Sequence, residues 1–202
     1  MNLLVHLYLA ERTGTSAAGQ ILGDMVKGRL DGRHGAAVER GIRLHRGIDR
    51  VSDDHEAHRA MRRRFPPPLR RYAGILVDIG FDYSLARAWP AAMHGSLVAF
   101  AQRAQRRVIA EWPQTAPLPA SRMRGLAATL AGYADPSGIQ RALDSVASRL
   151  ARASPVADAL PAMLAERPAF DARLPDILAD LDAFAAAGAN ESVWRPARPA
   201  ER

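Results

Sequence analysis

Apolar residues recur at helical spacing along most of this chain, and no segment shows the strict alternation of a half-buried strand. Short β-like runs, such as residues 74–80, sit inside longer helical patterns. Glycines and prolines separate the periodic segments, and three consecutive prolines at 66–68 exclude helix there. The pattern therefore predicts an all-α fold, an irregular helical bundle. We expect helices at about residues 2–11, 16–27, 35–51, 56–64, 69–89, 96–112, 122–133, 136–151 and 155–188.

The chain is long enough for one domain with a sizeable core. It has 202 residues, of which 48% are hydrophobic. We expect a single helical domain at residues 1–188. Residues 189–202 contain two prolines and three arginines and are expected to form a flexible tail.

The chain contains no cysteine, which excludes disulfides, zinc–thiolate sites and cysteine nucleophiles. Its apolar N-terminal segment lacks the basic region and the cleavage site of a signal peptide. No apolar run approaches the roughly 20 residues of a membrane helix. We therefore expect a cytoplasmic protein without a membrane span.

The charge balance is strongly basic, with a formal net charge of +7. An acidic partner is the natural inference, although an arginine- and alanine-rich composition also produces such a balance. Local clustering of arginines favours a partner surface, and no recognition motif supports a nucleic-acid role. The candidate partner-binding residues are Arg62, Arg63, Arg64, Arg70 and Arg71.

Two pairs of polar residues stand four positions apart in helical segments. They are His45 with Asp49 and Asp78 with Asp82. Residues at this spacing share one helix face, with Cβ atoms roughly 5–6 Å apart. Two carboxylates side by side on a largely apolar helix repel each other and resist burial. A divalent cation between them would remove that conflict.

His6 and Asp24 also interrupt apolar helical segments, at positions where core residues are expected. Taken singly, each polar residue has an ordinary explanation, either a hydrogen-bonded core histidine or a salt bridge to a nearby arginine. Taken together, the four acids and two histidines favour a metal site. Imidazole and carboxylate ligands without sulfur suit manganese, iron, zinc or magnesium. Such a site activates water and polarises a phosphoryl oxygen, and Arg46 is a candidate for stabilising phosphate charge.

Motifs for other chemistries are absent. The chain has no Walker loop, no GxGxxG fingerprint and no GxSxG elbow. His55 and His58 follow two consecutive aspartates, and we expect them to have a structural or peripheral role.

Four segments, in this order and spacing, resemble a known family, the acyl carrier protein phosphodiesterases. They are MNLLVHLYLA, GQILGDMVKG, GIRLHRGIDRVSDDH and RRYAGILVDIGFDYSLARAW. The strong part of the resemblance covers residues 1–90, and a weaker part continues to about residue 151. It implies an all-helical relative of the HD-type metal phosphohydrolases. It also implies removal of 4′-phosphopantetheine from holo-acyl carrier protein with a manganese-like cofactor.

The resemblance also implies roles for individual residues. The metal-site or catalytic candidates are Asp24, His45, Asp49, Asp78 and Asp82, with His6 beside them. In the family a histidine typically follows the second aspartate of the long helix, where this chain has Tyr83. If that histidine is a metal ligand, this chain lacks one ligand. If it supports a ligand instead, the Tyr83 hydroxyl can take its place.

Three functional interpretations follow. The first is a phosphodiesterase acting on acyl carrier protein, whose acidity suits the basic balance of this chain. In it, Asp24 completes the metal shell or positions the nucleophile, and Arg46 stabilises developing charge. The second is a metal-dependent hydrolase of another small phosphodiester or nucleotide. The third is a helical module that binds an acidic protein without hydrolysing it.

Overall fold

The computed structural model describes residues 1–92, 95–150 and 154–189. Within these ranges the chain forms helices, turns and loops and no strand, which confirms the predicted all-α fold. Most of the predicted tail, residues 190–202, lies outside the described residues. The helices are α1 (Leu3–Thr13), α2 (Ala17–Leu22), α3 (Ala36–Asp54), α4 (Glu56–Arg64), α5 (Ala73–Ala92), α6 (Leu97–Glu111), α7 (Leu126–Gly132), α8 (Pro136–Ala147), α9 (Leu160–Ala165) and α10 (Arg167–Ala189), with 3₁₀ turns η1 (Leu69–Tyr72) and η2 (Ala120–Met123).

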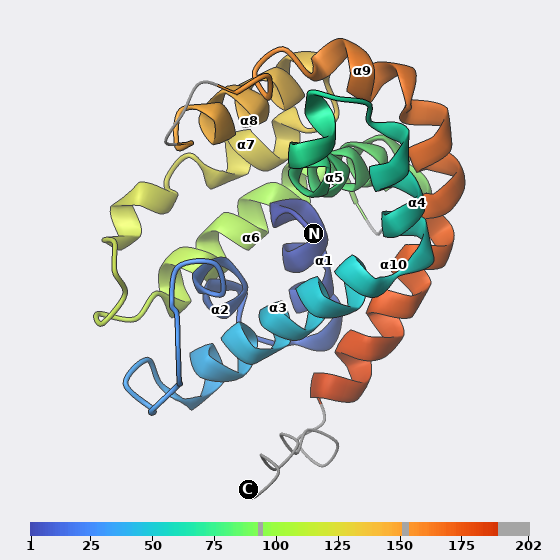
Figure 1. The fold of residues 1–202 in the computed structure, drawn as a ribbon. Helices are drawn as coiled ribbons and strands as arrows, with labels where there is room; N and C mark the ends of the chain where they lie inside the picture. Colours follow the sequence, from blue (N-terminus) through green and yellow to red (C-terminus); the bar gives the residue numbers. More distant parts are fainter. Residues whose placement is uncertain (93–94, 151–153, 190–202) are drawn as a thin grey trace, which may run out of the picture.

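Helix α1 is buried on all sides. Every side chain from Leu4 to Ala10 is buried, including that of His6. The helix packs against α2, α3, α5 and α10, so that the N-terminus lies near the middle of the molecule and α10 runs along its edge (Figure 1). A helix that is apolar all round belongs in a core. None of the described helices, however, has the length and apolar character needed to cross a membrane.

Helices α2 and α3 meet through glycines. A Cβ atom at Gly19 would lie 2.7 Å from the Cα of Gly41, so only glycine permits this approach. The sequence predicted that α2 would continue to residue 27, but it ends at Leu22. The backbone at Gly23 then passes directly over the ring of His45, where a Cβ would lie 2.2 Å from the ring carbons. The turn that follows brings Asp24 to His45.

The last third of the chain is divided where one helical segment, 155–188, was predicted. Residues 155–158 form a turn, and α9 is separated from α10 at Glu166. Pro168 explains the break, because it has no N–H to continue the hydrogen bonding of α9. Helix α10 then packs against α3, α4 and α5 and covers one side of the core.

Candidate metal centre

Two histidine rings and one carboxylate meet where α1 lies against α3. His6 Nε2 is 3.0 Å from Asp49 Oδ1, and His45 Nε2 is 3.0 Å from Asp49 Oδ2. The two rings stack with their centroids 4.1 Å apart. One ligand atom from each of the three residues lies within 4.8 Å of the other two. Neighbouring ligands of one small divalent ion stand about 3 Å apart when each bond is about 2.0–2.2 Å, so this group has the size of a metal site.

The two ring nitrogens of His6 face two different side chains, Gln20 and Asp49. His6 Nδ1 lies 3.0 Å from Gln20 Oε1, and its Nε2 faces Asp49. Burial lowers the pKa of His6, and the neighbouring His45 lowers it further, so the neutral ring carries one proton. With that proton donated from Nδ1 to Gln20, a lone pair on Nε2 points at a carboxylate oxygen. A cation between these two acceptors would remove the repulsion, and a support of this kind is usual for metal-binding histidines.

Asp24 joins the group from the turn after α2. Its Oδ1 is 3.4 Å from His45 Nε2, and its side chain is 70% exposed. Burial disfavours charge on His45, but its hydrogen bonds to Asp24 and Asp49 raise the pKa of the imidazole to about 9. Burial likewise opposes ionisation of Asp49, yet the hydrogen bond from His45 holds the pKa of that carboxyl well below its usual range. The carboxylates of Asp24 and Asp49 therefore stay ionised at neutral pH.

Asp78 faces the same place from α5. The terminal ammonium of Met1 lies 3.2 Å from Asp78 Oδ1 and 3.1 Å from Asp49 Oδ1. Burial disfavours the charged form of this amino group. The carboxylates of Asp78 and Asp49 outweigh that effect and raise its pKa to about 10. In turn, although burial works against ionisation, the ammonium and His58 lower the pKa of Asp78. The space between Asp49 and Asp78 thus stabilises positive charge.

A hydrogen-bonded chain supports Asp78 from behind. Arg62 Nε donates to His58 Nδ1 at 2.9 Å, which assigns the ring proton of His58 to Nε2. That Nε2 donates to Asp78 Oδ1 at 2.9 Å, and the His58 side chain is fully buried. Arg62 also pairs with Asp53 at the edge of the site. The chain fixes the orientation of Asp78 and connects the site to the basic surface of α4.

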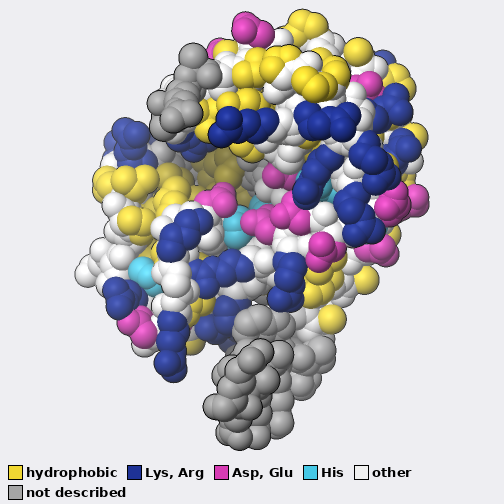
Figure 2. All heavy atoms as spheres, viewed as in Figure 1, with side chains coloured by type: hydrophobic (Ala, Val, Ile, Leu, Met, Phe, Trp, Pro, Cys, Tyr) yellow, Lys and Arg dark blue, Asp and Glu magenta, His cyan; other side chains and the backbone are white. Residues whose placement is uncertain are grey.

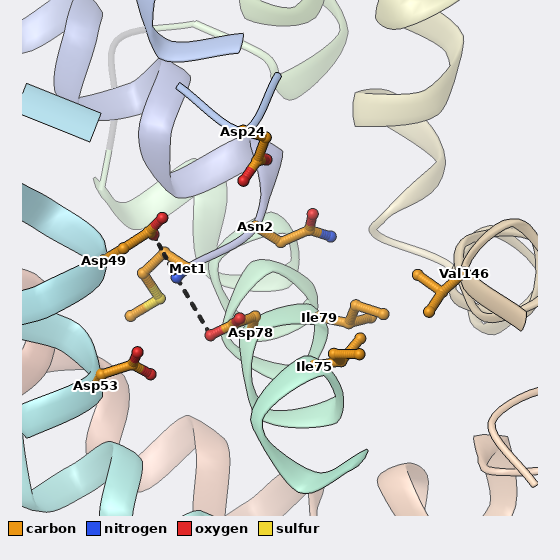
Figure 3. Close-up of a pocket in the computed structure, with 9 residues that line it drawn as sticks. All are labelled: Met1, Asn2, Asp24, Asp49, Asp53, Ile75, Asp78, Ile79 and Val146. Carbon is orange, nitrogen blue, oxygen red and sulfur yellow. Dashed lines mark hydrogen bonds and ion pairs between the residues drawn. The ribbon is translucent and has the colours of Figure 1, made fainter. Parts of the chain in front are cut away.

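These groups open onto a pocket of about 230 Å³. Figure 3 shows the four carboxylates around Met1, with three aliphatic side chains on the opposite side. On the molecular surface, acidic and histidine side chains gather near the middle of one face, with lysine and arginine around them (Figure 2). Four carboxylates alone repel a phosphate, whereas a divalent cation reverses the local charge. The lining residues are Met1, Asn2, Asp24, Asp49, Asp53, Ile75, Asp78, Ile79 and Val146.

Asp82 has a different position from the one predicted. One turn beyond Asp78, its carboxylate accepts hydrogen bonds from the N–H groups of Leu4 at 2.7 Å and Val5 at 3.0 Å. These N–H groups belong to the first turn of α1 and have no partner within the helix. Burial raises the pKa of Asp82 to about 7, despite the two donors. Asp82 therefore caps α1 and positions His6, and the structure does not place it among the ligands.

Arg46 also differs from its predicted role. Its two terminal nitrogens donate to the carbonyl oxygens of Gly28, at 2.9 Å, and Val26, at 2.6 Å. It does not line the pocket. Arg46 therefore holds the loop that follows Asp24, and this geometry offers no contact with a phosphate group.

Comparison with known proteins identifies a family and several relatives of this chain. A family model described as acyl carrier protein phosphodiesterase matches residues 1–181 of this chain. The chain belongs to the acyl carrier protein phosphodiesterase family. Its relatives in this family include a protein of that name from Serratia proteamaculans (strain 568), 38% identical over 118 residues, which are 58% of this chain and 61% of the relative. The protein of that name from Klebsiella pneumoniae subsp. pneumoniae is 31% identical over 161 residues, 78% of this chain and 83% of the relative.

No solved structure matches the chain. The resemblance of the fold to HD-type phosphohydrolases therefore stays a prediction.

Tyr83, the departure from the family pattern, lies in the hydrophobic core. Its side chain is 3% exposed, and the Arg87 guanidinium lies over its ring at 5.6 Å. It is not among the residues that line the pocket. Because position 83 is one residue past Asp82 on α5, it points to a different helix face from Asp78. The candidate metal-binding group formed by His6, His45 and Asp49 does not include this position.

The five arginines predicted to bind an acidic partner protein lie together at the end of α4 and in η1. Three of them already pair with carboxylates within the chain, Arg62 with Asp53, Arg63 with Glu56 and Arg64 with Glu166. Arg70 donates to backbone carbonyls, and Arg71 stacks over the ring of Tyr72 at 5.9 Å. Neither Arg70 nor Arg71 pairs with a carboxylate in the described residues, so their charges are the most available.

Sequence reasoning missed several groups at this site. Gln20 orients His6, and His58, expected to be structural or peripheral, orients Asp78. The spacing of four residues between His58 and Arg62 was a usable signal, because it predicts the contact observed at 2.9 Å. His55, by contrast, caps α4 by accepting from the Ala57 N–H. Asn2 and Asp53 gave no sequence signal.

Proposed function

We propose that this protein is a metal-dependent phosphodiesterase that hydrolyses the bond between 4′-phosphopantetheine and acyl carrier protein, releasing the apo-protein. Membership of the family supports the reaction. The observation that carries the proposal is the group of His6, His45 and Asp49, whose ligand atoms lie within 4.8 Å of one another. Of the three residues, Asp49 lines the open pocket.

His6, His45 and Asp49 would hold the metal, with Asp24 or Asp78 as a further oxygen ligand. The donor set fits a divalent cation, because two imidazoles and a carboxylate converge and His6 Nε2 faces an acceptor. A bound divalent cation supplies positive charge for the phosphoryl oxygens and makes a nearby water more acidic. Nitrogen and oxygen ligands without sulfur favour manganese, with iron, magnesium and zinc as the alternatives to compare.

Asp24 is the carboxylate best placed to act on an attacking water. Its side chain is largely exposed and points into the pocket, while its Oδ1 stays 3.4 Å from His45 Nε2. The hydrogen bond to His45 lowers the pKa of Asp24, so the carboxylate is ionised and able to accept a proton. Asp78 is held in one orientation by His58 and keeps a second carboxylate beside the reacting phosphate.

The protein substrate would approach over the basic surface beside the pocket. Acyl carrier protein is acidic, and complementary charge accelerates and orients such an encounter. Arg70 and Arg71 have no carboxylate partner in the described part of the chain, and Arg62 reaches the site through His58. We expect this reaction in the cytoplasm, the location predicted from the sequence.

Intact mass spectrometry of holo-acyl carrier protein tests the proposal. After incubation with this protein and Mn²⁺, we expect loss of the phosphopantetheine mass, and a chelator should abolish that loss. The Asp49→Asn variant is the control for metal-dependent contamination. An unchanged mass with folded, metal-loaded protein would indicate another phosphodiester substrate. An unchanged mass with no metal bound would favour a helical module that binds without hydrolysis.

A further inference from the structure

A second pocket lies beside the candidate metal centre. Its volume is about 330 Å³, within the range of about 300–1,000 Å³ typical of small-molecule sites. Asn2, Ile79 and Val146 line both pockets, so the two pockets adjoin at these residues. Figure 3 shows Asn2 between the carboxylates and Val146, and Figure 2 shows a recess with hydrophobic side chains beside the acidic group.

The chemistry of this second pocket differs from that of the metal centre. Its walls come from the start of α1 and from α5, α7 and α8, and none of its lining residues is acidic. Leu3, Ile79 and Ala142 supply apolar surface. Asn2 Nδ2 donates to the hydroxyl of Tyr133 at 3.2 Å, and both side chains line the space. Further hydrogen-bonding groups come from Thr129 and Ser145, and positive charge comes from Arg141 and Arg149.

We propose that the second pocket binds the pantetheine arm while the phosphate lies at the metal centre. This inference rests on the proposed function. The arm carries, in order from its phosphate, a geminal dimethyl group, a hydroxyl, two amides and a thiol. The dimethyl group would meet Ile79 and Val146 at the junction of the pockets, and the amides would reach the polar side chains beyond. The apolar group nearest the phosphate would thus meet apolar side chains, and the polar groups further along the arm would meet polar side chains.

Binding of the arm would serve the selectivity of the reaction. A metal centre whose groups contact only the phosphate would accept any exposed phosphodiester. Contacts with a part of the substrate that does not react supply binding energy that positions the reacting phosphate. The second pocket therefore selects diesters that carry pantetheine.

The absence of cysteine provides a direct test, because a single introduced thiol can capture the thiol of pantetheine. We would make Thr129→Cys in the second pocket and Ser148→Cys as a matched control on the exposed end of α8, outside it. Within the described residues, the Thr129 hydroxyl donates to the carbonyl of Gly125, the N-cap of α7, so its replacement should leave the fold intact. Each variant is equilibrated with pantethine, the disulfide of pantetheine, and increasing 2-mercaptoethanol. Intact mass then gives the fraction captured.

The expected result is that Thr129→Cys retains pantetheine up to a 2-mercaptoethanol concentration about tenfold higher than Ser148→Cys does, since non-covalent contacts raise the effective concentration of the arm. Adding Ser145→Trp, which fills the pocket, should remove this difference. Reaction of both variants with iodoacetamide corrects for unequal thiol reactivity. Release at the same concentration from both variants would overturn the inference.

The test needs neither metal nor turnover, so it separates the two proposals. Hydrolysis of holo-acyl carrier protein without selective capture would leave the phosphodiesterase function standing and show that the arm lies elsewhere. Selective capture without hydrolysis would establish a pantetheine pocket and overturn the proposed reaction.

Discussion

The two pairs at a spacing of four residues behave differently. On α3, His45 and Asp49 lie 3.0 Å apart, and Asp49 lines the pocket. On α5, only Asp78 faces the pocket, while Asp82 turns to the first N–H groups of α1. Equal spacing in the sequence therefore led to one complete pair and one divided pair.

The difference lies in what each helix meets. Helix α3 is met there by the turn after α2 and by α1, which offer the side chains of Asp24 and His6. One turn beyond Asp78, α5 is met by the N-terminus of α1, whose N–H groups need an acceptor. A carboxylate that neutralises a helix N-terminus needs no cation. The spacing of two residues in the sequence determines whether they share a helix face. The element that packs against that face determines what each side chain binds.

The largest effect is expected for Asp49→Asn. It removes the carboxylate between the two histidines. A bound cation would stabilise transition-state charge by several kcal/mol, so weaker cation binding should lower kcat/KM by about 10³-fold. The rate of phosphopantetheine release measures this effect, with Asp82→Asn as the control that makes the same substitution outside the His6, His45 and Asp49 group. Near-normal turnover by Asp49→Asn would mean that the ligands lie elsewhere.

Asp82→Ala should affect stability rather than metal binding. It leaves two buried N–H groups of α1 without an acceptor, each costing about 1–3 kcal/mol. We expect the free energy of unfolding in urea to fall by about 3 kcal/mol, with Mn²⁺ affinity nearly unchanged in the folded protein. Loss of Mn²⁺ affinity without loss of stability would return Asp82 to the ligands.

A smaller effect is expected for His58→Phe, which removes the support of Asp78 but not its carboxylate. Loss of such support typically lowers metal affinity or activity by about 10–100-fold, and we expect a decrease of about tenfold in kcat/KM. Arg59→Ala, on an exposed turn of the same helix, is the matched control. Equal activities of the two variants would show that Asp78 needs no orienting partner.

The smallest effect is expected for Arg46→Ala. It removes two hydrogen bonds to the loop after Asp24, worth about 1 kcal/mol of stability in total. Thermal unfolding measures this loss, and Mn²⁺ affinity should stay within about twofold. A hundredfold loss of turnover at unchanged stability would instead support the role at the phosphate predicted from the sequence.

The helices and part of the candidate metal centre could be predicted from local sequence patterns. Helix α4 begins and ends at the predicted residues, 56 and 64, and the proline run that follows explains where it ends. The polar interruptions of apolar helices led to His6, His45 and Asp49. The partners of Asp82 could not be predicted, since they lie 77 and 78 positions away at the start of α1. The bonds of Arg46 could not be predicted for a similar reason, because its acceptors are carbonyls of a loop without periodicity.

Titration of the chelator-treated protein with Mn²⁺, followed by electron paramagnetic resonance of the free ion, tests the central claim most directly. The wild-type chain should bind one ion. Asp49→Asn and His6→Gln should bind at least about tenfold more weakly, as expected for loss of a ligand. Folded Asp82→Asn should bind like the wild type. Wild-type affinity in Asp49→Asn, or loss of binding in folded Asp82→Asn, would contradict the assignment of His6, His45 and Asp49 as the metal-binding group.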